Sequence, residues 1–145
     1  MKRPLLCLFV LAILGPLALI AGEKANTIRL HPGDTVYARF QEKGKKLKLL
    51  SATKEKDANA QLVISLSAKD KDGTTTLKIE NAFSDDLVYK GTMRSHVLDR
   101  HAPLADCPIV GGKMGTVSLP PLVDEVTLFD FQFEPATLLE KDSDH

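Results

Sequence analysis

The chain alternates short apolar runs with clusters of turn residues over most of its length. From residue 27 onward, apolar and polar side chains repeat with a period of two, the signature of half-buried strands. Leu62, Ile64 and Leu66, for example, fall on one face, with smaller and polar residues between them. The pattern predicts strands at Thr27–His31, Thr35–Gln41, Lys45–Ala52, Gln61–Ala68, Thr74–Asn81, Leu87–Met93, Thr116–Leu119 and Val126–Glu134.

Turn residues separate these runs. The segment His31–Asp34 contains Pro-Gly, and Lys69–Gly73 ends in Asp-Gly, two pairs typical of tight turns. Frequent strand signals without a long helical period predict an all-β fold, an antiparallel β-sandwich of the immunoglobulin-like or a related type. A closed barrel is the second alternative. We expect Phe129, Phe131 and Phe133 of the last strand to share one face and pack in the core.

The start of the chain has a different pattern. A short basic stretch precedes an almost wholly apolar run over residues 5–21, as in a cleavable secretory signal. We expect residues 1–22 to be a helical signal peptide that is removed, 23–135 to form a single β-sandwich domain, and 136–145 to be a flexible acidic tail. An uncleaved membrane anchor is the alternative, because a spanning helix needs about 17–25 apolar residues.

Charge and cysteine content limit the classes of partner and the cellular compartments that the chain fits. Of 19 basic and 19 acidic side chains, two basic ones, Lys2 and Arg3, lie in the predicted signal peptide. The mature chain is then slightly acidic, which disfavours a nucleic-acid partner. Only Cys107 of the two cysteines survives processing, so an intrachain disulfide cannot form. These features predict a periplasmic or secreted bacterial protein without a stable transmembrane segment after processing.

Between Arg94 and Lys113 the alternation fades, and the residues with most chemical interest lie in or beside this stretch. Imidazole, thiolate and thioether groups are ligands of soft and borderline metals such as copper. They predict a metal site formed by Cys107, His96, His101, Met93 and Met114. The alternative is that all five are ordinary loop and edge residues, because their spacing alone does not bring them to one point.

Cys107 supports three further interpretations. It can be a small buried hydrophobe, or it can pair with a second chain in a disulfide-linked dimer. It can also be a nucleophile. A nucleophile would need a histidine base, His96 or His101, and an acid that orients this base, Asp99 or Asp106.

Two further motifs have weaker signals. Lysines crowd the third predicted strand and its flanks, at positions 43, 45, 46, 48, 54 and 56. They can contact anionic lipid or polysaccharide, or protect an edge strand against aggregation. The pair Gly111-Gly112 lacks the residue order of a phosphate-binding loop and predicts a turn or bulge.

The sequence contains no recognisable catalytic set. It therefore favours an exported, non-enzymatic β-sandwich protein of the bacterial cell envelope, acting as a binding or interaction module without a cofactor. The expected partner is an unknown envelope protein or a polysaccharide. A periplasmic copper-binding or other metal-binding protein is the alternative.

Overall fold

The computed structural model describes residues 26–105 and 107–134. The regular secondary structure of these residues consists of strands, with no helix among them. Every strand pair is antiparallel. The strands are β1 (Ile28–Leu30), β2 (Thr35–Lys43), β3 (Lys46–Thr53), β4 (Leu62–Leu66), β5 (Thr76–Asn81), β6 (Leu87–Ser95), β7 (Arg100–Pro103), β8 (Met114–Ser118) and β9 (Glu125–Phe133). The predicted signal helix, its cleavage site and the acidic tail lie outside the described residues.

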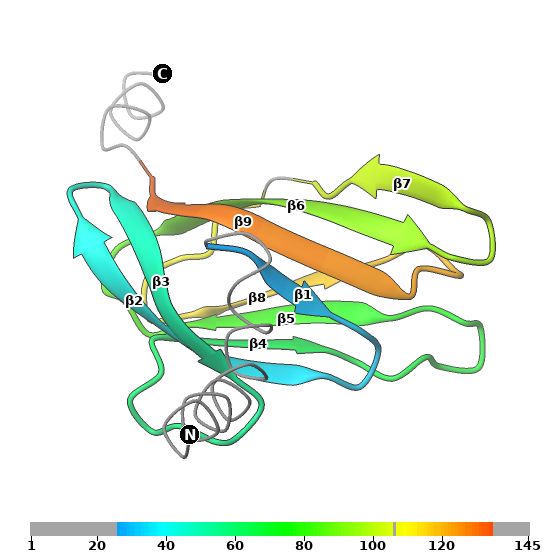
Figure 1. Cartoon of the computed structure of the whole chain (residues 1–145), viewed down its shortest axis with the longest axis horizontal. Coiled ribbons are helices and arrows are strands. Elements are labelled where there is room, and N and C mark those ends of the chain that lie inside the picture. Colours follow the sequence, from blue (N-terminus) through cyan, green and yellow to red (C-terminus); the bar gives the residue numbers. More distant parts are fainter. Residues whose placement is uncertain (1–25, 106, 135–145) are drawn as a thin grey trace, which may run out of the picture.

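A single sheet in the order β7-β6-β9-β3-β2-β4-β5-β8, with β1 added beside β9, curls around the core. Figure 1 shows β1, β6, β7 and β9 in one layer and β4, β5 and β8 in the other, with the β2–β3 hairpin at one end. The hairpin joins the layers, because β2 pairs with β4 and β3 reaches β9 through Lys46 and Gln132. A register shift between Arg39 and Phe40 follows the last β2–β4 pair, as is common where a strand turns a corner.

The predicted all-β antiparallel class is confirmed, and the architecture has features of both predicted alternatives. The sheet curls like half a barrel, and its two halves face each other like the layers of a sandwich (Figure 1). Among the described residues, the end strands β7 and β8 do not pair with each other, so the barrel is not closed.

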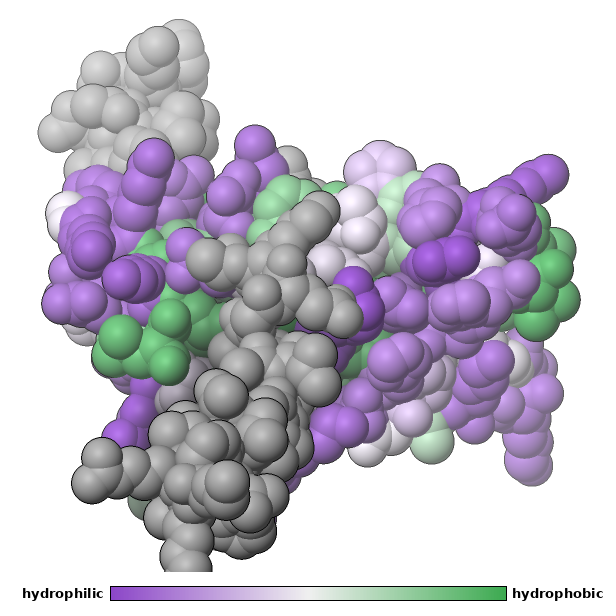
Figure 2. Space-filling view, in the orientation of Figure 1, coloured by the Kyte–Doolittle hydropathy of each residue, from purple (hydrophilic) through white to green (hydrophobic). Residues whose placement is uncertain are grey.

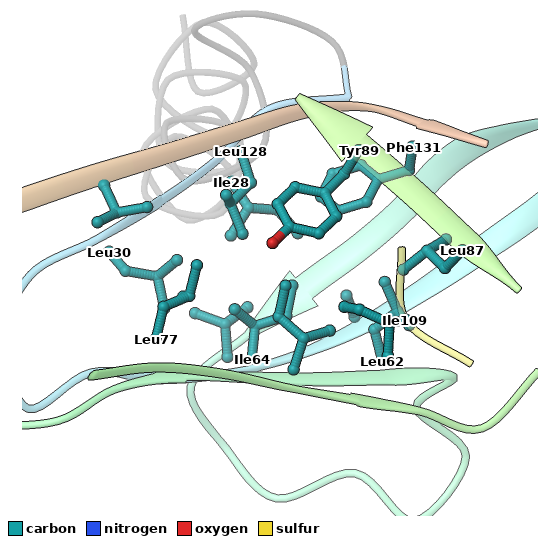
Figure 3. Close-up of a cluster of buried hydrophobic side chains, with 14 of the residues drawn as sticks. Ile28, Leu30, Leu62, Ile64, Leu77, Leu87, Tyr89, Ile109, Leu128 and Phe131 are labelled. Atoms are coloured by element: carbon teal, nitrogen blue, oxygen red, sulfur yellow. The ribbon is translucent and has the colours of Figure 1, made fainter. Parts of the chain in front are cut away.

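The core fills the space between the two layers. Figure 3 shows Ile28 and Leu128 from one layer facing Ile64 and Leu77 from the other. These four side chains are at most 2% exposed, and the alternation predicted for β4 and β5 is confirmed by their burial. Burying one such side chain contributes about 1.5–3 kcal/mol. The core thus provides the driving force for folding without a disulfide.

One strand of the structure was absent from the prediction. The strand β7 falls in the stretch where the sequence pattern predicts none, and it pairs with the end of β6. Three of its four residues are exposed and the fourth is half-buried, so it has no buried face to produce a period of two. Hydrogen bonding to β6, rather than burial, defines this strand.

The prediction that three phenylalanines of β9 share one face is wrong for Phe129. Phe131 and Phe133 are buried in the core, but the buried residue before them is Leu128. Asp130 has a φ of +53°, and the register with β6 shifts at this point. The extra residue is a β-bulge that reverses the alternation, so Phe129 leaves the core face.

Candidate functional site

A groove of about 610 Å³ opens beside the β2–β3 hairpin. It is bounded by this hairpin, by β6 and by the bulged end of β9. Leu47 and Phe131 border it from below, but both side chains are buried in the core. Four lysines line it: Lys43, Lys46, Lys48 and Lys90. We call this feature the lysine groove.

The lysine groove carries an excess of positive charge. Lys90 Nζ is 3.9 Å from Asp130 Oδ2, whereas the other three lysines form no ion pair within the described part of the chain. Lys43 and Lys46 are directly opposite each other in the hairpin. Like charges in this position destabilise an antiparallel pair. An unfavourable pair of this kind that brings no structural gain is typical of a functional surface.

A second charged cluster lies at the other end of the sandwich, where the β1–β2 turn, the β6–β7 turn and the start of β9 meet (Figure 1). Its centre is Glu125, whose side chain is only 13% exposed. Glu125 Oε1 is 3.2 Å from Arg29 Nε. Glu125 Oε2 is 3.6 Å from His96 Nε2 and 3.7 Å from His31 Nε2. One carboxylate oxygen is thus close to two imidazoles.

Each of these histidines has an aspartate near its other ring nitrogen. His96 Nδ1 is hydrogen-bonded to Asp124 Oδ1, and the His96 backbone N–H donates to Asp124 Oδ2 at 2.9 Å. Partial burial raises the pKa of Asp124, but the hydrogen bonds from His96 outweigh it and hold this pKa below its usual value. His31 Nδ1 is 3.6 Å from Asp34 Oδ2, which also accepts the His31 backbone N–H at 2.8 Å. Both rings therefore direct Nε2 towards Glu125.

The structure does not bring the five predicted metal ligands together. His96 belongs to the cluster at Glu125. His101 is exposed on β7 and lines, together with Arg29 and Glu125, a hollow over the outer face of β1, β6 and β9, but forms no ion pair with Glu125. Met93 packs against the core from β6. Within the described ranges, no three His, Cys, Asp or Glu side chains surround a common point. The copper set stays a prediction without a shared site.

Cys107 and Met114 lie in and after the connection between β7 and β8. Cys107 is exposed, so its interpretation as a buried hydrophobe is wrong. It lines a small hollow of about 140 Å³ together with Tyr89, while Met114 is 54% exposed at the start of β8. No hydrogen bond joins Cys107 to His96 or His101 among the described residues, so the predicted catalytic set is not assembled there. The disulfide-linked dimer stays a prediction.

The sequence analysis missed His31 and Glu125, and it missed Lys90 and Asp130 of the lysine groove. None of them stands in a local motif. His31 reads as part of a turn, and Glu125 as the residue before a strand. These residues become recognisable as sites only in the folded chain, because they come together from different strands and turns of the sheet.

The surface has no broad apolar patch on the face seen in Figure 2, which is mostly hydrophilic with small apolar areas. Large apolar side chains with substantial exposure are Leu50, Val97, Leu98, Val110, Met114 and Leu122. The structure contains, in its described residues, no helix that is long and apolar enough to span a membrane. The lysine groove and the cluster at Glu125 are therefore the features with the clearest binding chemistry.

No protein-family profile matches the chain, and no curated protein matches it. Among solved structures, the chain is similar to the trimeric lipoprotein SadB of Salmonella enterica, with a TM-score of 0.44 and 10% sequence identity. The match covers 90% of this chain and 70% of that one. A likeness at this level transfers neither a ligand nor an assembly.

Proposed function

We propose that the protein is exported and acts in the bacterial cell envelope as a non-enzymatic binding module whose lysine groove takes an anionic polysaccharide. The observation that carries this proposal is the groove itself, which is lined by four lysines and one carboxylate, that of Asp130. The signal-like start of the sequence supports export to a periplasmic or secreted location.

The size and charge of the groove suit a short stretch of an acidic glycan. Its volume of about 610 Å³ lies in the range of small-ligand sites, about 300–1,000 Å³. The ammonium groups of Lys43, Lys46 and Lys48 are exposed, so they can reach carboxylate or phosphate groups along a chain of sugars.

The position of the lysines favours a ligand that enters a hollow over one that presents a flat surface. The lysines come from the hairpin and from β6 and line one hollow. A lipid bilayer would engage them best if they stood on a convex or flat face. We therefore commit to a polysaccharide, and lipid binding becomes an outcome that contradicts the proposal.

The test measures binding of polygalacturonate, a carboxylated polysaccharide, to the purified mature protein at several salt concentrations. We expect saturable binding that weakens with added salt, because screening acts on exposed charges. Replacing Lys43, Lys46 and Lys48 together by Gln should weaken binding by a factor between about 3 and about 150, since each exposed ion pair contributes about 0.2–1 kcal/mol.

The matched control replaces three exposed lysines outside the groove, Lys56, Lys71 and Lys113, by Gln. It changes the net charge by the same amount, so it should retain nearly all the affinity if the groove is the site. Equal losses in the two triple variants would indicate nonspecific attraction. Tighter binding to vesicles of phosphatidylglycerol than to polygalacturonate would also contradict the proposal.

A further inference from the structure

Two separations at Glu125 Oε2 are close to those between neighbouring ligands of a metal centre. Zinc bonds to nitrogen and oxygen are about 2.0–2.2 Å long, so neighbouring ligand atoms in a tetrahedral site stand about 3.3–3.5 Å apart. The Nε2 atoms of His31 and His96 are 3.7 and 3.6 Å from Glu125 Oε2. Each separation is thus only slightly wider than coordination requires.

We propose that His31, His96 and Glu125 bind a Zn²⁺ ion, with water as the fourth ligand. Two imidazoles and one carboxylate are a ligand set that zinc accepts. The three donor atoms do not surround one point in the structure as it stands, so the rings turn towards each other when the ion binds. The histidine side chains are 56% and 51% exposed, which leaves them room to turn.

The outer contacts of both rings fit this role. A histidine that ligates a metal with one nitrogen commonly donates its other N–H to a carboxylate, which fixes the tautomer and the ring orientation. His96 has Asp124 in this position, and His31 has Asp34. This pairing, repeated at two histidines that come from different turns, is independent of the distances to Glu125.

Three carboxylates, those of Asp34, Asp124 and Glu125, lie in the cluster, and three cations act on them: Arg29 contacts Glu125, Lys54 is 3.4 Å from Asp34, and Lys69 acts on Asp124. With neutral imidazoles these charges balance, so the ligand atoms themselves, and not a net negative charge, would hold the ion. Arg29 contacts Oε1 of Glu125 and leaves Oε2 to the ion.

The site differs from the metal set predicted from the sequence, because it uses only His96 of that set. The ion would join the β1–β2 turn, the β6–β7 turn and β9. Any ligand that binds the folded chain and not the unfolded one stabilises the fold. We therefore expect Zn²⁺ to raise the midpoint of thermal unfolding of the protein.

The experiment titrates the full mature chain, stripped with EDTA and dialysed, with ZnCl₂ by calorimetry and follows thermal unfolding in parallel. We expect one Zn²⁺ per chain and a rise in the unfolding midpoint. His31→Ala and His96→Ala should each abolish both effects. Asp124→Asn should weaken binding by about 10–100-fold, as loss of an outer hydrogen-bond partner does.

The matched control is Cys107→Ser, which removes an exposed metal-binding side chain outside the cluster. His101 lines a hollow together with Glu125, so His101→Ala tests whether this neighbouring histidine takes part. Both variants should bind Zn²⁺ like the wild type. Unfolding midpoints in EDTA check that each variant folds, because the His31 and His96 side chains are more than half exposed but that of Asp124 is only 20% exposed. Absence of binding by the wild type, or an equal loss in His101→Ala or Cys107→Ser, would overturn the proposal.

Discussion

Replacing Gly111 by alanine tests how the connection between β7 and β8 is held. A β-carbon on Gly111 would stand 2.0 Å from the carbonyl oxygen of Ser84 and 2.4 Å from its carbonyl carbon. Ordinary C···O contacts begin at about 3.3 Å, so one of the two backbone segments must move by more than about 1 Å. The obstacle is main chain, which cannot turn aside as a flexible side chain can.

The movement would also disturb two hydrogen bonds. The Gly111 N–H donates to Asp86 Oδ1 at 2.9 Å, and the Gly112 N–H donates to the Phe83 carbonyl at 2.8 Å. Overpacking costs about 1–3 kcal/mol, and each lost hydrogen bond about 0.5–1.5 kcal/mol. Gly111→Ala should therefore lower the free energy of unfolding by about 3 kcal/mol or more.

The neighbouring residue supplies the control. A β-carbon on Gly112 meets nothing within 4 Å, but its φ of +71° is unfavourable for alanine. The strain of about 1–2 kcal/mol is partly offset, because alanine also restricts the unfolded chain. Gly112→Ala should cost only about 1 kcal/mol.

The assay is urea unfolding of both variants and the wild type, followed by circular dichroism. With a slope of about 1–3 kcal/mol per molar urea, a difference of 2 kcal/mol between the variants moves the midpoint by about 1 M. The prediction states which of the two variants loses more stability, as well as how much stability each one loses. Similar midpoints for Gly111→Ala and Gly112→Ala would refute the close approach to Ser84.

Two other predictions concern β9 and the β4–β5 turn. Phe131 is 2% exposed, so Phe131→Ala should cost about 3–5 kcal/mol in urea unfolding, and Phe129→Ala only about 1 kcal/mol; equal losses would contradict the bulge at Asp130. The hydroxyl of Thr74 donates to Asp70 at 2.5 Å and, with backbone N–H groups, lowers the pKa of Asp70. A lowered carboxyl pKa stabilises the fold above the unfolded pKa, and this contribution disappears as pH falls through the folded pKa. The stability lost in Asp70→Asn should thus be larger at pH 7 than at pH 3, and a constant difference would contradict this assignment.

The sequence predicts the strands that have one buried face. In β4, Leu62, Ile64 and Leu66 alternate with less buried residues, and burial of one face produces this period directly. The period fails for β7, which has no buried residue, and it fails at Asp130, where one inserted residue exchanges the faces of β9. In β9 the apolar positions change phase from Val126 and Leu128 to Phe131 and Phe133, but the same letters also fit an uninterrupted stripe of Phe129, Phe131 and Phe133.

The two candidate sites were predictable to different degrees. The hairpin lysines are close in sequence, so their cluster is visible before folding, whereas Lys90 and Asp130 join it only through the pairing of β6 with β9. The cluster at Glu125 depends on contacts between distant segments. Of the residues in this cluster, the sequence predicts only His96 as a metal ligand. The fold does not bring the other ligands predicted with it into contact with His96.

The strand β9 contributes a residue to each of the two sites, and its length separates them. Glu125 begins the strand and Asp130 follows five residues later, a distance of about 17 Å along an extended chain. Effects of substitutions that are more than about 7–10 Å apart and share no partner are usually additive. Between these residues β9 is paired with β6 on one side and β1 on the other, so a small movement at Glu125 is not easily passed to the groove. Zinc binding and polysaccharide binding should therefore fail separately, and loss of one would leave the other proposal standing.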